Sequence, residues 1–182
     1  SKGNKDVLFL KLYSDFFDKV LSQVYRVLKP SGQFYLNLKS GTINKTLVTP
    51  HWIEFLVSFK KFKLKSYIIW KYAGSFDSTK IRFHLDYEII YHLSKTDDIT
   101  INYDKDEKDP LTSVWYIPHF IKDRLHPVQM PEAVAEKIIM RGSREGDIVL
   151  DPFAGSGTTL VVADKLKRGF IGIEINPSYV KI

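Results

Sequence analysis

A turn with two glycines near the end of the chain limits the fold more than any other feature of the sequence. The apolar segment "DIVLD" (residues 147–151) precedes "PFAGSG", and a helical pattern follows over residues 158–166. Gly155 and Gly157 permit a tight turn and let a ligand approach the backbone. The apolar segment "FIGIEI" (residues 170–175) then completes a strand–turn–helix–strand unit. Such a unit is typical of an α/β fold whose ligand lies at the carboxyl ends of the strands.

The rest of the chain alternates between expected strands and helices. Apolar residues spaced three and four apart predict helices over residues 13–28 and 51–62. Residues 126–143 are expected to hold another helix, with Pro131 near its first turn and Gly142 near its end. Short apolar runs rich in Ile and Tyr predict strands over residues 33–38, 65–72 and 85–94, with residues 113–120 extended. Residues 95–110 show no period and are expected to form a loop. The alternation predicts an α/β fold with a largely parallel sheet.

Three interpretations of the two-glycine turn compete. A P-loop needs Lys after the second glycine, where this chain has Thr158, so ATP or GTP binding by that route is disfavoured. A dinucleotide fingerprint needs a third glycine, where the chain has Leu160. A tight turn without a ligand stays open as an alternative. Against it, Asp151 and Phe153 stand where a ligand site needs them, and Glu174 follows the first glycine by about 20 residues, the spacing of a ribose-binding acid.

Several motifs together resemble one family. "VLDPFAGSGTT" followed by "RGFIGIEINPSYV" looks like the S-adenosylmethionine motif of amino-group DNA methyltransferases. "HPVQMPEAVAEKII" resembles the segment that wraps the methionine end of their cofactor, and "YRVLKPSGQFYLNL" resembles the helix and strand after their catalytic loop. The resemblance implies a Rossmann-like methyltransferase fold with a mostly parallel sheet, helices on both faces and an antiparallel edge hairpin. It also implies a circular permutation, because the cofactor half stands last.

The resemblance implies an S-adenosyl-L-methionine site in the last third of the chain. Glu174 would hold the ribose hydroxyls, and Thr158 would begin the helix under the methionine end of the cofactor. His126 and its neighbours would shape the methionine pocket, although a loop histidine before a proline is the ordinary alternative for His126. The implied cofactor-binding residues are Asp151, Pro152, Phe153, Gly155, Ser156, Gly157, Thr158, Glu174, Asn176, His126, Pro127 and Gln129.

The catalytic motif that the resemblance implies does not occur in the sequence. In the family, Asp, Asn or Ser precedes Pro-Pro and an aromatic residue, which together hold the target amino group and stack the flipped base. No such tetrapeptide occurs in the 182 residues, so we expect it before Ser1, in a missing N-terminal segment or a companion subunit. The chain itself would then contain no catalytic residue. It would form one methyltransferase domain, with a catalytic-half remnant (1–71), a target-recognition region (72–118) and a cofactor half (119–182).

The resemblance implies double-stranded DNA as the partner. The net charge of +6 favours an anionic partner, and a charge that serves only solubility is an equal alternative. The charge is uneven, because residues 60–71 are strongly basic and residues 97–109 are acidic. The acidic run would repel DNA and is expected to face elsewhere, whereas the lysines could equally be a solvated helix end. The candidate DNA-binding residues are Lys60, Lys61, Lys63, Lys80 and Arg82.

Other features of the sequence narrow the chemistry. The chain has no cysteine, which excludes the covalent adduct of C5-cytosine methylation and fits a cytoplasmic protein. No histidine spacing suggests a metal site, and no apolar run approaches the roughly 18 residues of a membrane span. The resemblance implies methylation of an exocyclic amino group, with a slight preference for cytosine N4 over adenine N6. A methyltransferase for another substrate and a non-catalytic cofactor- or DNA-binding fragment or subunit stay open.

Overall fold

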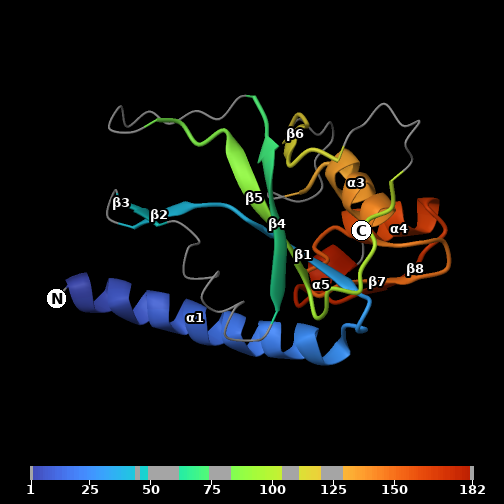
Figure 1. The fold of residues 1–182 in the computed structure, drawn as a ribbon. Helices are drawn as coiled ribbons and strands as arrows, with labels where there is room; N and C mark the ends of the chain where they lie inside the picture. The colour runs from blue at the N-terminus through green and yellow to red at the C-terminus, as the bar shows by residue number, and fades with distance from the viewer. Residues whose placement is uncertain are drawn as a thin grey trace. The chain divides into compact units, whose positions relative to one another are not determined.

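The computed structural model describes residues 2–43, 46–48, 62–73, 83–103, 111–119 and 129–180. The chain divides into two compact units, and Figure 1 labels the elements of both. The first unit comprises Ser1–Ile69 and Tyr87–Ile99, and the second comprises Trp70–Asp86 and Thr100–Ile182. Each unit has its own apolar core. The three-part division expected from the sequence stays a prediction.

The first unit begins with a long helix that leads into a strand. Helix α1 (Lys2–Val27) starts earlier than expected, but it ends where the sequence "KPSG" predicts an end. The Gly32 N–H donates to the Lys29 carbonyl at 2.9 Å, and this turn directs the chain into β1 (Gln33–Leu38). Strand β1 pairs antiparallel with β5 (Tyr87–Ser94). The predicted bounds of β1 are therefore confirmed, and β5 lies within the predicted range.

The core of the first unit lies between α1 and the strands. Phe17 and Leu21 of the helix pack with Phe62, Tyr91 and Leu93, and all five side chains are buried. These residues recur on one face of α1 and alternate along β5, as burial of one side requires. Burying each such side chain contributes about 1.5–3 kcal/mol, so this cluster accounts for the attachment of α1 to its strands.

Strand β4 (Lys63–Lys71) lies beside β5, so the first unit contains the strand order β1-β5-β4. On β5, His92 is almost fully buried, and its Nε2 lies 2.8 Å from the Gln33 Oε1. Its ring stacks on Tyr35 with 4.6 Å between centroids. Burial, together with the positive charge of Lys65, lowers the pKa of His92 from 6.5 to about 4. This imidazole is therefore a neutral part of the core near pH 7.

A small hairpin of β2 (Gly41–Ile43) and β3 (Thr46–Val48) was not expected from the sequence. Its two strands pair antiparallel, with Gly41 opposite Val48. Three residues a strand are too few for the alternation of apolar and polar residues that identifies a strand. The expected helix over residues 51–62 lies outside the described residues, apart from Phe62.

The second unit is built on two parallel strands and the helices that pack on them. Strand β7 (Ile148–Asp151) pairs parallel with β8 (Gly169–Gly172), and α4 (Thr158–Lys165) connects them. Helix α3 (Glu132–Gly142) packs against α4 through a core of Ala135, Ile139, Val162 and Ala163. A short helix, α5 (Pro177–Val180), ends the described chain. The predicted strand–turn–helix–strand unit is confirmed.

Gly172 shows why the second strand of this unit contains glycine. A Cβ atom at Gly172 would lie 2.4 Å from Leu160 Cδ1 and 3.2 Å from Ala154 Cβ. Real Cβ atoms do not approach other atoms to 2.4 Å, so a side chain here would require the Leu160 side chain to shift or α4 to move. Gly169 is different, because a Cβ there would meet Ile148 Cγ1 at 3.5 Å, an ordinary contact distance.

Residues far apart in the sequence complete the second unit. Asn102 follows the end of the first unit, and its amide donates to the Met140 and Ser143 carbonyls at 3.0 and 2.6 Å. Arg141 returns a hydrogen bond to the Asn102 carbonyl at 3.0 Å. Helix α3 ends with carbonyl groups that lack partners within the helix, and Asn102 supplies donors for them. Strand β6 (Val114–Tyr116), which follows β4 in the strand order of its sheet, confirms the expected extended segment.

The α/β class is confirmed, and the described strand pairings are mixed. The β1/β5 and β2/β3 pairs are antiparallel, whereas β7/β8 is parallel. Parallel pairing occurs where α4 provides the crossover between the strands, as such connections require. No helix within the described residues is both long enough and apolar enough to span a membrane.

Candidate cofactor site

The candidate site is the turn between β7 and α4 together with the residues that follow β8. The Ile173 N–H donates to the Asp151 carbonyl at 2.9 Å, and the Ala154 N–H donates to the Ile173 carbonyl at 2.9 Å. The Asp151 carboxylate accepts the Phe153 N–H at 3.0 Å. These bonds bring the turn to the carboxyl ends of both parallel strands, where open α/β sheets bind ligands.

Both glycines of the turn have backbone angles that favour glycine. Gly155 has φ 53° and Gly157 has φ 79°. Gly157 is also the N-cap of α4, and no side chain of the described residues caps that helix end. The first amides of a helix have no partner within it and favour an anion or a carboxylate. Neither glycine therefore has a side chain that would keep a ligand away from the backbone of the turn.

Glu174 joins the two halves of the candidate site. Its Oε2 accepts the Gly155 N–H at 2.8 Å, and its Oε1 accepts the Asn176 N–H at 2.7 Å. Asn176 in turn accepts the Ser178 N–H at 3.0 Å, at the start of α5. Each carboxylate oxygen has two acceptor positions, so an oxygen that accepts one backbone N–H can also accept a hydroxyl. The half-buried Glu174 side chain is thereby oriented by the backbone on both sides.

Apolar side chains around the turn are exposed. The Phe153 ring is 55% exposed, and Ile173 and Ile175 are 55% and 98% exposed. A polar turn with an exposed aromatic ring suits a ligand that has both polar groups and a flat apolar part. The role of Ile173, whose backbone bonds to both Asp151 and Ala154, was missed in the sequence. An isoleucine at the end of a strand gives no signal for a backbone contact of this kind.

The structure places most of the predicted cofactor residues together. Those in the turn are Asp151, Pro152, Phe153, Gly155, Ser156, Gly157 and Thr158, and those after β8 are Glu174 and Asn176. Gln129 lies shortly before α3 in the chain, and its place in the site stays a prediction. His126 and Pro127 lie outside the described residues.

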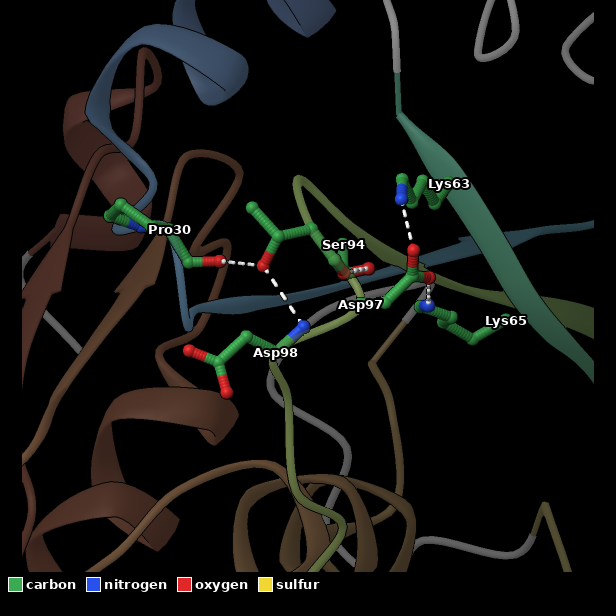
Figure 2. A network of polar contacts seen from close by, with 7 residues as sticks. Pro30, Lys63, Lys65, Ser94, Asp97 and Asp98 are labelled. Atoms are coloured by element: carbon green, nitrogen blue, oxygen red, sulfur yellow. Dashed lines mark hydrogen bonds and ion pairs between the residues drawn. The ribbon is translucent and has the colours of Figure 1, made fainter.

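The predicted DNA-binding residues lie in other parts of the chain. Lys63, on β4, has its ammonium group on the Asp97 carboxylate, and Lys65 contacts the other oxygen of the same carboxylate (Figure 2). The two lysines lower the pKa of Asp97 to about 2. The first residue of the acidic run therefore contacts the basic segment, although the two runs were expected to face apart. Lys60, Lys61, Lys80 and Arg82 lie outside the described residues.

The described residues contain no group of three or more His, Asp or Glu side chains that could hold a metal ion. The polar groups of the candidate site include backbone amides and the carboxylates of Asp151 and Glu174. Backbone amides bind anions, and a carboxylate accepts hydroxyls. The arrangement suits a polar organic ligand at the carboxyl ends of β7 and β8.

Comparison with known proteins identifies relatives across nearly the whole chain. The family model described as DNA methylase, for N6 and N4 methyltransferases, matches residues 4–182. DNA adenine methyltransferase YhdJ of Escherichia coli (strain K12) is 34% identical over 94% of this chain and 65% of its own length. Type II methyltransferase M.HpaI of Haemophilus parainfluenzae is 31% identical over 97% of this chain and 60% of its own length. The chain therefore spans less than two thirds of these relatives.

Solved structures share the fold. The cytosine-N4-specific PvuII DNA methyltransferase has a TM-score of 0.84 at 22% identity, over 92% of this chain and 68% of its own. A DNA modification methylase of Thermus thermophilus, TTHA0409, solved with S-adenosyl-L-methionine, has a TM-score of 0.76 at 24% identity, over 94% of this chain and 75% of its own. The predicted Rossmann-like methyltransferase fold is confirmed. From the family match and the relatives, the chain belongs to the N6 and N4 DNA methylase family.

Proposed function

We propose that the protein transfers a methyl group from S-adenosyl-L-methionine to an exocyclic amino group of a flipped base in double-stranded DNA. The observation that carries the proposal is the Glu174 carboxylate, held by the Gly155 and Asn176 N–H groups beside the two-glycine turn. The DNA methylase family and its two curated relatives support the reaction class. The net charge of +6 supports an anionic partner.

The residues of the turn fit the parts of this cofactor. Glu174 would accept hydrogen bonds from the ribose hydroxyls. Gly155 and Gly157 would let the cofactor approach the backbone, and the first amides of α4 would face its methionine end. The exposed Phe153 ring would contact an apolar part of the ligand. When bound, S-adenosyl-L-methionine supplies an electrophilic methyl group on a sulfonium ion.

The groups that hold the target base would come from outside the printed sequence. Methylation of a delocalised amino group needs acceptors for its hydrogens and an aromatic ring for the flipped base. The printed sequence contains no Pro-Pro-Tyr or Pro-Pro-Phe segment to supply them. A further segment or a companion subunit would therefore complete the site.

Two target bases fit this proposal. The segments "VWYIP" and "HPVQMPE" favour cytosine N4 slightly. The relative named as a DNA adenine methyltransferase, at 34% identity, favours adenine N6. Both targets are exocyclic amines, so one cofactor half serves either reaction.

The test uses the full-length protein, because the segment that holds the target base would lie outside the printed sequence, and incubates it with S-adenosyl-L-methionine carrying a labelled methyl group and with duplex DNA of mixed sequence. The DNA is then digested, and its nucleosides are identified by mass spectrometry. Labelled N4-methylcytosine or N6-methyladenine is the expected product, and its identity names the target base. Label on protein or RNA, but not on DNA, would contradict the proposal.

A second candidate is a protein that binds the cofactor and DNA without transfer. The absence of the catalytic tetrapeptide from the printed sequence favours it. Calorimetric binding of S-adenosyl-L-methionine with no methylated nucleoside would support this candidate. Activity that returns when a companion chain with the tetrapeptide is added would instead assign the protein to a split enzyme.

A further inference from the structure

Two lysines on one strand share a single carboxylate in the first unit. Lys63 and Lys65 are separated by one residue on β4, so their side chains project from the same face. The Lys63 ammonium contacts Asp97 Oδ2, and the Lys65 ammonium contacts Asp97 Oδ1. Figure 2 shows one lysine on each oxygen of the carboxylate. One acidic oxygen is thus matched to each ammonium group.

The backbone around Asp97 is fixed without help from the lysines. The Ser94 hydroxyl donates to the Thr96 carbonyl at 2.6 Å, and the Thr96 hydroxyl donates to the Pro30 carbonyl at 3.0 Å. Thr96 also accepts the Asp98 N–H at 3.2 Å (Figure 2). The turn therefore presents the Asp97 side chain to the lysines, and loss of the carboxylate would leave these backbone contacts in place.

The contact is accessible to solvent and is unequal in charge. The Asp97 side chain is 69% exposed, and the side chains of Lys63 and Lys65 are 47% and 22% exposed. Two ammonium groups against one carboxylate leave a positive charge at the site. Exposed ion pairs contribute little to stability and are screened by salt, so another anion can replace the carboxylate at small cost.

We propose that Lys63 and Lys65 form a phosphate-contacting site for duplex DNA, and that the Asp97 carboxylate occupies this site until a DNA phosphate replaces it. The inference rests on the proposed function and adds Lys65 and Asp97 to the DNA-binding surface. Asp97 acts as an internal competitor, which lowers affinity for any duplex that does not bring a phosphate to both lysines. Each phosphate that replaces bound counterions steepens the salt dependence of binding by about 0.9 in log–log units.

The experiment compares Asp97→Asn with Asp98→Asn, which removes the same charge from the next residue. The Asp98 carboxylate points away from both lysines in Figure 2. Affinity for a fluorescent duplex of about 20 base pairs is measured by anisotropy from about 50 to 200 mM salt. We expect Asp97→Asn to bind about tenfold more tightly, with a salt slope steeper by about 1 to 2, whereas Asp98→Asn changes affinity less than about twofold.

Three outcomes decide the inference. The gain must disappear when Lys63→Ala and Lys65→Ala are added to Asp97→Asn, and a gain that persists overturns the assignment of the lysines. If Asp97→Asn and Asp98→Asn raise the affinity for DNA equally, the gain is a general effect of charge, and the competition between Asp97 and a DNA phosphate is overturned. If the wild-type protein binds DNA and Asp97→Asn does not change its affinity, the replacement of Asp97 by a phosphate is overturned, but the proposed function is not. If neither the wild-type protein nor the Asp97→Asn variant binds DNA, the proposed function is contradicted as well.

A measurement on the wild-type protein tests the inference even if the Asp97→Asn variant does not fold. Reductive methylation of lysines is followed by mass spectrometry with and without duplex DNA. Lys63 and Lys65 are expected to lose reactivity when DNA is added, while Lys167, on the cofactor half, keeps its own. Unchanged reactivity of both β4 lysines in a DNA-bound sample would overturn the inference.

Discussion

Two carboxylates of the protein lie just after a strand, and they are held in different ways. Glu174 follows β8 and accepts two backbone N–H groups. Asp97 follows β5 and is held by two lysine ammonium groups. Backbone donors are fixed by the fold, whereas lysine side chains can rotate away from a carboxylate. The comparison indicates that Glu174 is a permanent part of a binding site and that Asp97 is a replaceable occupant of one.

The largest effect is expected from Glu174→Gln. The new amide would place an N–H₂ group against one of the two backbone donors and remove an acceptor for the ribose. We expect the affinity for S-adenosyl-L-methionine to fall about 10- to 100-fold, measured by calorimetry. The matched control is Glu145→Gln, because Glu145 is exposed and lies 3.6 Å from Lys167. Equal losses in both variants would show that Glu174 has no special role.

The next effect concerns the packing behind the cofactor turn. Gly172→Ala would place a methyl group 2.4 Å from Leu160 Cδ1, and we expect the free energy of unfolding to fall by about 1–3 kcal/mol. Gly169→Ala is the control, since its methyl group would lie at 3.5 Å from Ile148 Cγ1. Adding Leu160→Ala should recover part of the loss in a double-mutant cycle measured by urea unfolding. Similar losses in both glycine variants would contradict this account.

A smaller effect tests the core of the first unit through pH. The pKa of His92 is lowered from 6.5 to about 4, so between these values the unfolded chain binds more protons than the folded one. The free energy of unfolding should therefore rise with pH in this window, by at most about 1.4 kcal/mol per pH unit. This stabilisation is complete above pH 6.5 and is lost as the pH falls toward 4.

The variant that checks the pH effect is His92→Gln. It should flatten the slope of unfolding free energy between pH 4 and 6.5, whatever its effect on absolute stability. His84→Gln is the comparison variant, because it removes an exposed histidine from the chain. Urea unfolding at several pH values provides the measurement. An unchanged slope in His92→Gln would assign the pH dependence to other groups.

The smallest effect is expected for the stability of Asp97→Asn. Asp97 and Lys63 are exposed to solvent and Lys65 is half-buried, so the melting temperature near neutral pH should shift by less than about 2 °C. The pKa of Asp97 is lowered from 3.8 to about 2, so any contribution is present above 3.8 and is lost as the pH falls through 2. A large shift near neutral pH would mean that the contact is structural and not exchangeable.

The cofactor half was more predictable from the sequence than the lysine contact, for a physical reason. The turn, its glycines and Glu174 form one local strand–turn–helix–strand unit, and the geometry of such units is fixed by nearby residues. The Lys63–Asp97 contact depends instead on which strands lie side by side, because β4 and β5 are separated by a long segment. The acidic run alone predicted repulsion from DNA. Neither charged run predicted that Asp97 would contact two lysines.

Other differences between the sequence-based expectations and the structure have the same cause. Nothing local identifies Asn102 as the residue that supplies donors to the end of α3, since its partners lie about 40 residues further along the chain. By contrast, β1 was predicted with its observed bounds, because Pro30 and Gly32 mark the turn before it. Turns marked by proline and glycine can be predicted from a sequence, whereas capping by a residue that is distant in the sequence cannot.

The close approach of Leu160 to Gly172 also constrains how this protein can change over evolution. The space between α4 and β8 holds one large side chain, and at present Leu160 fills it. A larger residue at position 172 requires the Leu160 side chain to move or to become smaller, so substitutions at the two positions are coupled. Among relatives that keep this turn, the volumes at the two positions should therefore vary inversely.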